Sequence, residues 1–462
     1  MKKAILSILA CTAFAAVAAE TPVLEIESGK IIGVPTDTGC AIVYKGIPYA
    51  APPVGNLRWR KPRPVEPWKG VRKCEKFGPA SMQGDQDKRS FYYREFFSDG
   101  DPERSEDCLY LNVWTPAAGS SSARLPVMLW IHGGAFSGGF GHEMEFDGEA
   151  FARRDVILVT INYRLGMCGF MAHPQLTAEN DGNGSGNYGL FDQLAALQWV
   201  KKNIRAFGGD PDNITVFGQS AGACSVQALI SSPLTAGLIS KAIIQSGGGL
   251  NGPLAAMPRA ELEKVNEELW NLAGMTTLEE MRAYPPERFG EVVSAYGKSK
   301  GGSVHPFWMT VDGELLTRPL TEAALAGGQL DIPYMIGYNK NDMSPEAMKK
   351  AAVNWSLLLE KQGRTPAYVY AFTRELPSYP DELKMEGDDK TGAFHSAELW
   401  YVFGTLKRSR RQFTAADYDL SERMVTYWTN FAKSGSPNGD GVPAWEPCVN
   451  EDRHIQILDV TD

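Results

Sequence analysis

The sequence lacks the features that mark several classes of protein. Its 462 residues contain no cysteine pair at Cys-x-x-Cys spacing, so no metal-binding cysteine motif is present. No run of lysine and arginine occurs, and the formal net charge of -9 at pH 7 disfavours nucleic acid and anionic membranes as partners. No internal repeat, low-complexity tract or linker divides the chain. We therefore expect a single domain that needs no metal or cofactor.

A hydrophobic run long enough to span a membrane is missing as well. The apolar segment at residues 1–19 follows Lys2 and Lys3 and ends in small residues, which is typical of a cleaved export signal. It is shorter than a helix that crosses a bilayer. A lipid anchor at Cys11 stays open as an alternative, although the residue two positions before it is bulky where a small one is usual. We expect a secreted or periplasmic protein in which residues 20–462 form the single domain.

What the sequence does contain is organised around one serine, Ser220. The β-branched and aromatic residues 214–217 predict a short buried strand, and the small apolar residues 221–230 predict a buried helix. Gly218 and Gly222 lie two residues to either side of the serine, which lets the strand and the helix approach closely. This Gly-x-Ser-x-Gly pattern is typical of a nucleophile elbow, which lifts a serine hydroxyl above the edge of a sheet. Ser220 is therefore the candidate nucleophile.

Buried strands that alternate with helical segments predict the fold class. Such strands favour an α/β fold, with a mainly parallel central sheet and helices on both faces. Between residues 23 and 49, β-branched runs separated by turns predict an antiparallel N-terminal edge. A charged helical segment at residues 254–290 is expected to cap the sheet. The other strands are expected near residues 108–114, 125–131, 156–162, 242–245, 334–338 and 367–372, and helices at residues 190–207 and 420–433.

A serine nucleophile needs a base, and the sequence offers six histidines. In the chain order of this fold the acid and then the histidine follow the serine, so the three histidines before Ser220 come too early. Of the later ones, one precedes a proline and one lies in the tail. His395, in a loop after a late strand, is left as the candidate base. The histidines set aside are His132, which is expected to brace the glycine turn beside it, and His142, His173, His305 and His454.

The acid and the oxyanion donors complete the predicted set. Asp342 follows the strand at residues 334–338 and is the candidate acid, with Glu346 as the nearest competitor. Acyl transfer also needs backbone donors for the oxyanion. The N–H of Ala221, directly after the nucleophile, is one donor. The His-Gly-Gly-Ala turn at residues 132–135 is expected to supply the others, because its small residues let a substrate approach the backbone.

An aromatic segment, residues 91–97, lies within an otherwise charged, loop-like stretch. Its rings either pin the loop to the core or line a substrate entrance. The residues themselves leave both interpretations open.

Several longer motifs resemble those of the type-B carboxylesterases, the family that includes the cholinesterases. They occur in the family's order and span nearly the whole chain after the export segment, which makes the resemblance specific. The motifs are Gly46-Ile47-Pro48-Tyr49-Ala50, Ser105-Glu106-Asp107-Cys108-Leu109-Tyr110-Leu111-Asn112, Gly186-Asn187-Tyr188-Gly189-Leu190, Phe207-Gly208-Gly209-Asp210-Pro211, Gly218-Gln219-Ser220-Ala221-Gly222 and Phe431-Ala432-Lys433-Ser434-Gly435.

The resemblance implies an α/β-hydrolase fold and hydrolysis of carboxylic esters through an acyl-serine intermediate. It implies oxyanion donors at Gly134, Ala135 and Ala221. It also implies a loop-closing disulfide between Cys74 and Cys108.

The histidine of the family matches at His395, but the acid departs from the usual pattern. The family usually has glutamate followed by glycine, whereas Asp342 is followed by Met343. Aspartate is the usual acid in the wider fold and can orient an imidazole equally well. The chain is also shorter than many members, which implies trimmed loops around the substrate gorge.

Two other functions stay open at this point. Some members of the family have lost the triad and act as binding or adhesion modules, and the same fold also hosts amidases and lactonases. The presence of Ser220, His395 and an acid favours an esterase that takes a small-molecule ester. Acyl and alcohol preference and oligomeric state do not follow from the residues.

Overall fold

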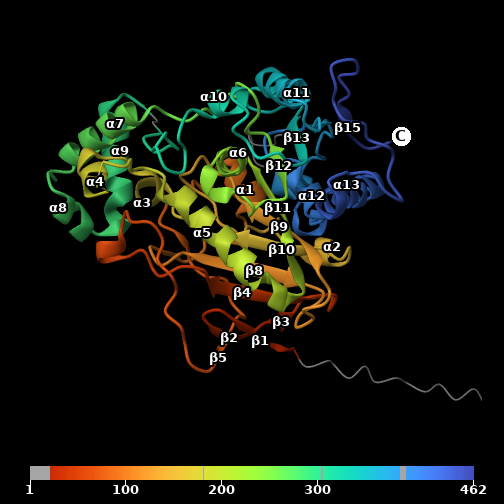
Figure 1. The fold of residues 1–462 in the computed structure, drawn as a ribbon, viewed down its shortest axis with the longest axis horizontal. Helices are drawn as coiled ribbons and strands as arrows, with labels where there is room; N and C mark the ends of the chain where they lie inside the picture. The colour runs from red at the N-terminus through yellow and green to blue at the C-terminus, as the bar shows by residue number, and fades with distance from the viewer. Residues whose placement is uncertain (1–20, 181, 303–304, 385–391, 462) are drawn as a thin grey trace, which may run out of the picture.

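The computed structural model describes residues 21–180, 182–302, 305–384 and 392–461. The predicted export segment, with Cys11, lies outside the described residues. The centre of the fold is a ten-stranded sheet in the order β15-β14-β13-β12-β11-β9-β10-β8-β4-β3 (Figure 1). Its strands are β3 (Val34–Pro35), β4 (Ile42–Pro48), β8 (Tyr110–Thr115), β9 (Leu125–Ile131), β10 (Ile157–Ile161), β11 (Gly209–Gln219), β12 (Lys241–Gln245), β13 (Tyr334–Asn339), β14 (Tyr368–Phe372) and β15 (Gln456–Leu458).

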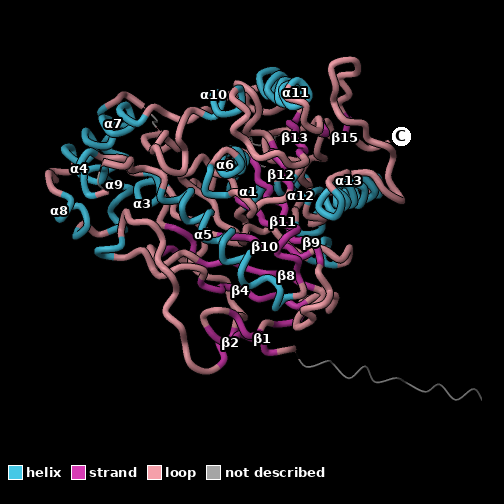
Figure 2. Tube along the Cα trace, in the orientation of Figure 1, coloured by secondary structure: helices cyan, strands magenta, loops and turns pink. Residues whose placement is uncertain are grey.

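The sheet is mainly parallel with an antiparallel edge, as predicted. All neighbours from β15 to β10 pair in parallel, and β8, β4 and β3 pair antiparallel at the N-terminal side. A smaller sheet beside this edge contains β1 (Val23–Ile26), β2 (Gly29–Ile32) and β5 (Val71–Lys73). Figure 2 shows the strands crossing the middle of the molecule. In parallel strands every carboxyl end lies at the same edge, so loops from β11 and β13 can meet there.

Helices cover both faces of the sheet because alternate residues of its strands are apolar on each side. In β9, Leu129 and Ile131 belong to one apolar cluster, and Met128 and Trp130 belong to the other. The first cluster contains buried residues of α5, α6 and α11, and the second those of α2, α12 and α13. These helices are α2 (Glu149–Ala152), α5 (Tyr188–Asn203), α6 (Ala221–Ile230), α11 (Pro345–Lys361), α12 (Leu399–Val402) and α13 (Ala415–Ser434).

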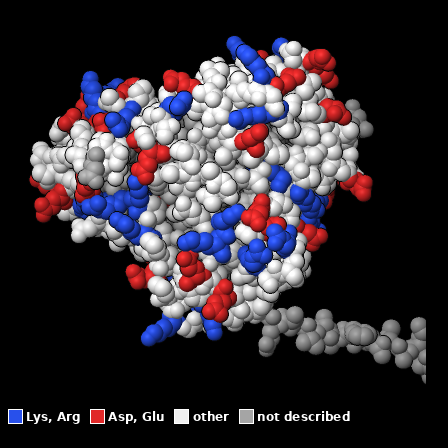
Figure 3. Space-filling view, in the orientation of Figure 1, with Lys and Arg blue, Asp and Glu red and all other residues white. Residues whose placement is uncertain are grey.

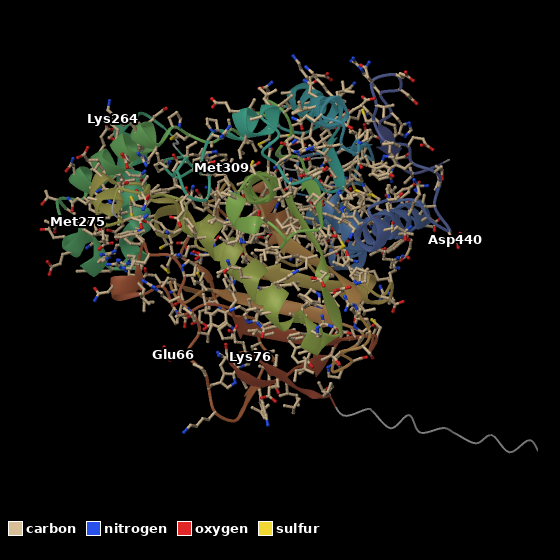
Figure 4. The ribbon with its side chains drawn as sticks, viewed as in Figure 1. Glu66, Lys76, Lys264, Met275, Met309 and Asp440 are labelled. Carbon is tan, nitrogen blue, oxygen red and sulfur yellow. The ribbon has the colours of Figure 1, made fainter. Side chains whose placement is uncertain are left out.

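The predicted helical cap is divided into three helices that lie at one side of the molecule. They are α7 (Arg259–Leu272), α8 (Leu278–Ala283) and α9 (Phe289–Ser299), grouped with α4 (Pro174–Glu179) in Figure 1. Figure 4 shows Lys264 and Met275 in this group, on the opposite side from Asp440. Trp270 packs on Trp59 with ring centroids 5.9 Å apart. The group is therefore anchored on the proline-rich N-terminal segment.

Cys74 and Cys108 do not form the disulfide that the resemblance implies. Both are buried free thiols. The N–H of Cys74 donates to the carbonyl of Ile32 (2.8 Å), and its carbonyl accepts from the N–H of Lys45 (2.9 Å). The thiol of Cys74 instead lies 4.0 Å from the carbonyl oxygen of Arg72. The expected bridge is therefore corrected to two separate buried thiols.

Candidate active site

The serine elbow is formed by the turn from β11 into α6. Ser220 has φ 58° and ψ -124°, a strained conformation that is rare for a residue with a side chain. A Cβ atom on Gly222 would lie 2.0 Å from the carbonyl oxygen of Ile131, so only glycine fits there. The close approach of α6 to β9 therefore depends on this glycine, and it presents Ser220 at the carboxyl edge of the sheet.

His395 and Asp342 form a close pair at the same edge. The Nδ1 atom of His395 lies 2.5 Å from Oδ1 of Asp342, and the carboxylate is fully buried. The loops that carry them are joined by backbone pairing, because the N–H of Asn341 donates to the carbonyl of Ala393 (2.9 Å). The competitor Glu346 lies in the first turn of α11 and is exposed. The geometry thus joins Asp342, and not Glu346, to the imidazole.

The ionisation of Asp342 follows from its partners. Burial alone would raise the pKa of this carboxyl. The hydrogen bond and charge of His395 outweigh that effect, helped by the backbone N–H of Met343, which donates to Oδ1 at 2.9 Å. The pKa of Asp342 therefore lies below its usual value, and at neutral pH the group is a carboxylate that can orient an imidazole.

Gln219 also contacts the imidazole of His395, which was not predicted from the sequence. Its side-chain nitrogen lies 3.2 Å from Nε2 of His395. Ser220 is adjacent, but its hydroxyl makes no hydrogen bond to any residue that the structure describes. Catalytic contacts are often long before substrate binds. In this resting arrangement the amide nitrogen of Gln219 lies near both ring nitrogens, since it is also 3.5 Å from Nδ1.

The predicted oxyanion turn lies directly against the nucleophile. A Cβ atom on Gly133 would lie 3.1 Å from Cβ of Ser220, which places the turn beside the serine. Gly134 and Ala135 both have positive φ, at 97° and 53°. Their N–H groups, like that of Ala221, donate no hydrogen bond within the described residues. All three N–H groups are thus without a partner among the described residues.

The other histidines occupy structural positions. His132 is fully buried and stacks on Tyr163 at 4.4 Å, and burial lowers its pKa to about 4. Its Nδ1 atom lies 2.9 Å from the carbonyl oxygen of Gly133 in the oxyanion turn. His132 therefore braces the turn as a neutral ring, as predicted. His173 stacks on Trp270 of α7, with ring centroids 3.8 Å apart.

The aromatic segment forms a short helix, α1 (Phe91–Phe96), where a loop was expected. Ser90 caps its first turn, and the rings of Phe91 and Phe96 are buried. The hydroxyl of Tyr92, which is partly exposed, donates to the carbonyl oxygen of His395 (3.2 Å). Most of the rings therefore pin the segment to the core, and one supports the histidine loop.

A second buried carboxyl, Glu398, lies close to the triad and was not predicted. It accepts a hydrogen bond from the side chain of Asn339 (2.5 Å), which also donates to the carbonyl of Phe394 (2.8 Å). Burial raises the pKa of Glu398, opposed by the Asn339 hydrogen bond and reinforced by the charge of Asp342. Because it follows His395 by three residues in the chain, it links the histidine loop to the end of β13.

The molecular surface in the view of Figure 3 carries acidic and basic side chains side by side. Among the described residues, no cluster of His, Cys, Asp or Glu has the arrangement of a metal site. Within the same residues, no helix has the length and apolar character that crossing a membrane demands.

The fold and the serine elbow together define an α/β-hydrolase. The family model described as the carboxylesterase family matches residues 20–354 and 346–462. The para-nitrobenzyl esterase of Bacillus subtilis (strain 168) is 34% identical, over 95% of this chain and 94% of that enzyme. The fumonisin B1 esterase of Sphingopyxis macrogoltabida is 32% identical, over 91% of this chain and 83% of that enzyme.

Solved structures agree with this relationship. A thermophilic pNB esterase superposes with a TM-score of 0.78 at 31% identity, and the match covers 95% of this chain and 96% of the other. A carboxylesterase of Geobacillus stearothermophilus gives a TM-score of 0.77 at 32% identity over the same shares. The chain belongs to the carboxylesterase family, and it is a carboxylic ester hydrolase.

Proposed function

We propose that this protein hydrolyses carboxylic esters with Ser220 as nucleophile, His395 as general base and acid, and Asp342 as the acid that orients and stabilises the imidazole. The observation that carries the proposal is the 2.5 Å contact between His395 Nδ1 and Asp342 Oδ1, at the edge where the strained serine turn meets a glycine-rich turn. A Ser-His-Asp set with free backbone donors is the arrangement that acyl transfer requires.

The reaction has two halves. The Ser220 oxygen attacks the ester carbonyl while Nε2 of His395 takes its proton, and the carboxylate of Asp342 stabilises the imidazolium that forms. The N–H groups of Gly134, Ala135 and Ala221 donate to the oxyanion. Collapse of the tetrahedral intermediate releases the alcohol, which receives the proton. Water, deprotonated by the same imidazole, then attacks the acyl-serine. The imidazolium returns the proton to the Ser220 oxygen, and the carboxylic acid is released.

The nucleophile is tested by covalent labelling. We expect a fluorophosphonate probe to label the wild-type protein once per chain, with the modified peptide containing Ser220. Ser220→Ala should be folded, unlabelled and inactive on short p-nitrophenyl esters. Ser225→Ala is a matched control, because that serine lies within α6 and its hydroxyl accepts a hydrogen bond from Gln193 (3.0 Å). A folded, unlabelled wild-type protein that hydrolyses no ester in a broad panel would instead support a binding role.

We propose that the enzyme is exported. The support is the order of two lysines, an apolar stretch and small residues at residues 1–19. Mass spectrometry of the protein from the producing cell should find a mature N-terminus at Glu20. A lipid-modified N-terminus at Cys11 would establish the anchored alternative, and an intact Met1 would exclude processing.

A further inference from the structure

Two buried carboxyls lie behind the oxyanion turn without a cation. Glu143 and Glu145 are 8% and 1% exposed. Neither forms an ion pair with lysine, arginine or histidine in the part of the chain that the structure describes. One oxygen of Glu145 is buried without a hydrogen-bond partner. The mechanism described above does not use these residues, which are called the acid pair below.

The acid pair is attached to the segment that follows the oxyanion turn. The N–H of Gly138 donates a hydrogen bond to the carbonyl oxygen of Gly134 (3.0 Å). Three side-chain oxygens then accept hydrogen bonds from the next three N–H groups: Gly139 donates to Gln83 (3.0 Å), Phe140 to Glu143 (2.8 Å) and Gly141 to Asn162 (2.7 Å). The middle acceptor of the three is therefore an ionisable group, and the position of the oxyanion turn depends on it.

The two carboxyls are hydrogen-bonded to each other. Two carboxylates cannot form such a bond, because both are acceptors, so one proton must lie between them. Burial raises the pKa of Glu143 to about 7, and burial together with the charge of Glu143 raises that of Glu145 well above its usual value. At neutral pH the pair therefore retains at least one proton.

Arg408 contacts this segment by donating to the carbonyl oxygen of Met144 (3.4 Å), but its ion pair is with Asp147 (2.6 Å). The other titratable groups that face the acid pair cannot balance a second negative charge. His132 and His142 have pKa values lowered to about 4 by burial and are neutral. Tyr163 has its pKa raised by burial and by the charge of Glu143. Glu95, from α1, already forms a fully buried ion pair with Arg411 (2.8 Å). Loss of the shared proton would thus leave two adjacent buried charges of the same sign in the segment that follows the oxyanion turn.

We propose that Glu143 and Glu145 are positioning residues that share one proton, and that this proton holds the oxyanion turn in its catalytic position. The proposal rests on the proposed role of that turn in ester hydrolysis. When the proton is lost, repulsion separates the two carboxyls and releases the N–H of Phe140 from Glu143. The donors at Gly134 and Ala135 are then displaced, and the negative charge of the pair opposes the oxyanion. The effect should fall on kcat more than on KM, because these donors act on the transition state.

The test is Glu145→Gln, which replaces the shared proton with an amide N–H that cannot be lost. We expect wild-type kcat to fall about tenfold for each pH unit above the loss of the shared proton, as for any single essential ionisation. Glu145→Gln should keep its kcat over the same range. Glu291→Gln is the matched control, since that carboxylate is 63% exposed beside Arg288, and its profile should follow the wild type. Superimposable alkaline limbs in wild type and Glu145→Gln would overturn the proposal.

Two readouts do not depend on activity. Infrared spectroscopy of the wild type at neutral pH should show a protonated carboxyl band that is absent from Glu145→Gln. Because the folded pKa values are raised, the wild type loses stability as pH rises from the unfolded glutamate pKa through the folded values, and Glu145→Gln should lose less. Absence of both differences would refute the shared proton. An inactive but folded wild type that shows both would instead refute the proposed ester hydrolysis.

Discussion

Replacement of Asp342 by asparagine tests the acid of the proposed triad most directly. The substitution keeps the shape of the side chain and removes its charge. The backbone N–H of Met343 donates to Oδ1 at 2.9 Å, and that of Asn339 donates to Oδ2 at 3.3 Å. The shorter contact favours the amide oxygen at the Oδ1 position, where it can still accept the Nδ1 proton of His395. We therefore expect the imidazole to stay in place and the loss to come mainly from the missing charge.

The size of that loss follows from the distance. Oδ1 of Asp342 and Nδ1 of His395 are 2.5 Å apart, which separates the centres of charge by roughly 4 Å when the imidazole is protonated in the transition state. At an effective dielectric constant of about 20 this attraction is about 4 kcal/mol. Its removal corresponds to a decrease in kcat of about 10³-fold. KM should change little, because the charge stabilises the transition state and not the bound ester.

The assay is steady-state hydrolysis of a short p-nitrophenyl ester, with the competent serine counted by fluorophosphonate titration. Glu346→Gln is the control, since Glu346 is exposed at the start of α11 and should retain activity within about twofold. Near wild-type turnover in Asp342→Asn together with an inactive Glu346→Gln would refute the assignment of the acid.

Two further substitutions probe the surroundings of the serine. Gln219→Glu places a negative charge 3.2 Å from Nε2 of His395, which favours the imidazolium. The acid limb of the kcat/KM profile should therefore move to higher pH by about one unit. An unchanged limb would show that the contact is absent in solution. Gly222→Ala puts a Cβ atom 2.0 Å from the carbonyl oxygen of Ile131 and should lower the free energy of unfolding by at least about 2 kcal/mol. In the helical control Gly290→Ala no atom lies within 4 Å, and thermal unfolding should show no loss.

The sheet and the elbow were predictable because they leave local patterns. Continuous apolar runs such as residues 125–131 match β9 residue for residue, and two glycines around Ser220 report a tight strand-to-helix turn. The three residues of β15 leave no such pattern, so this edge strand was missed. α1 was expected as a loop, because its six residues are too few to show a helical pattern of apolar residues. Its rings are buried by contacts with distant parts of the chain.

Contacts between distant segments were the least predictable part of the site. Gln219 is a neighbour of Ser220 in the chain, but its contact with His395 joins the end of β11 to a distant loop. The sequence around Glu143 and Glu145 looks like an ordinary solvated segment. Only the burial of the two side chains in the structure makes them unusual. The pairing of Cys74 with Cys108 was wrong because the resemblance carries residue types but not the path of the chain between them.

The backbone pairing between the loops of Asp342 and His395 has a mechanical consequence. Asn341 holds Ala393 at two points, through its N–H (2.9 Å) and through its side-chain oxygen, which accepts from the N–H of Ala393 (3.0 Å). Displacement of one loop must therefore carry the other with it, so the acid and the base move as a single body. The distance that can still change is then the one between the Asp342–His395 pair and the turn of Ser220. Binding of an ester would have to shorten that distance.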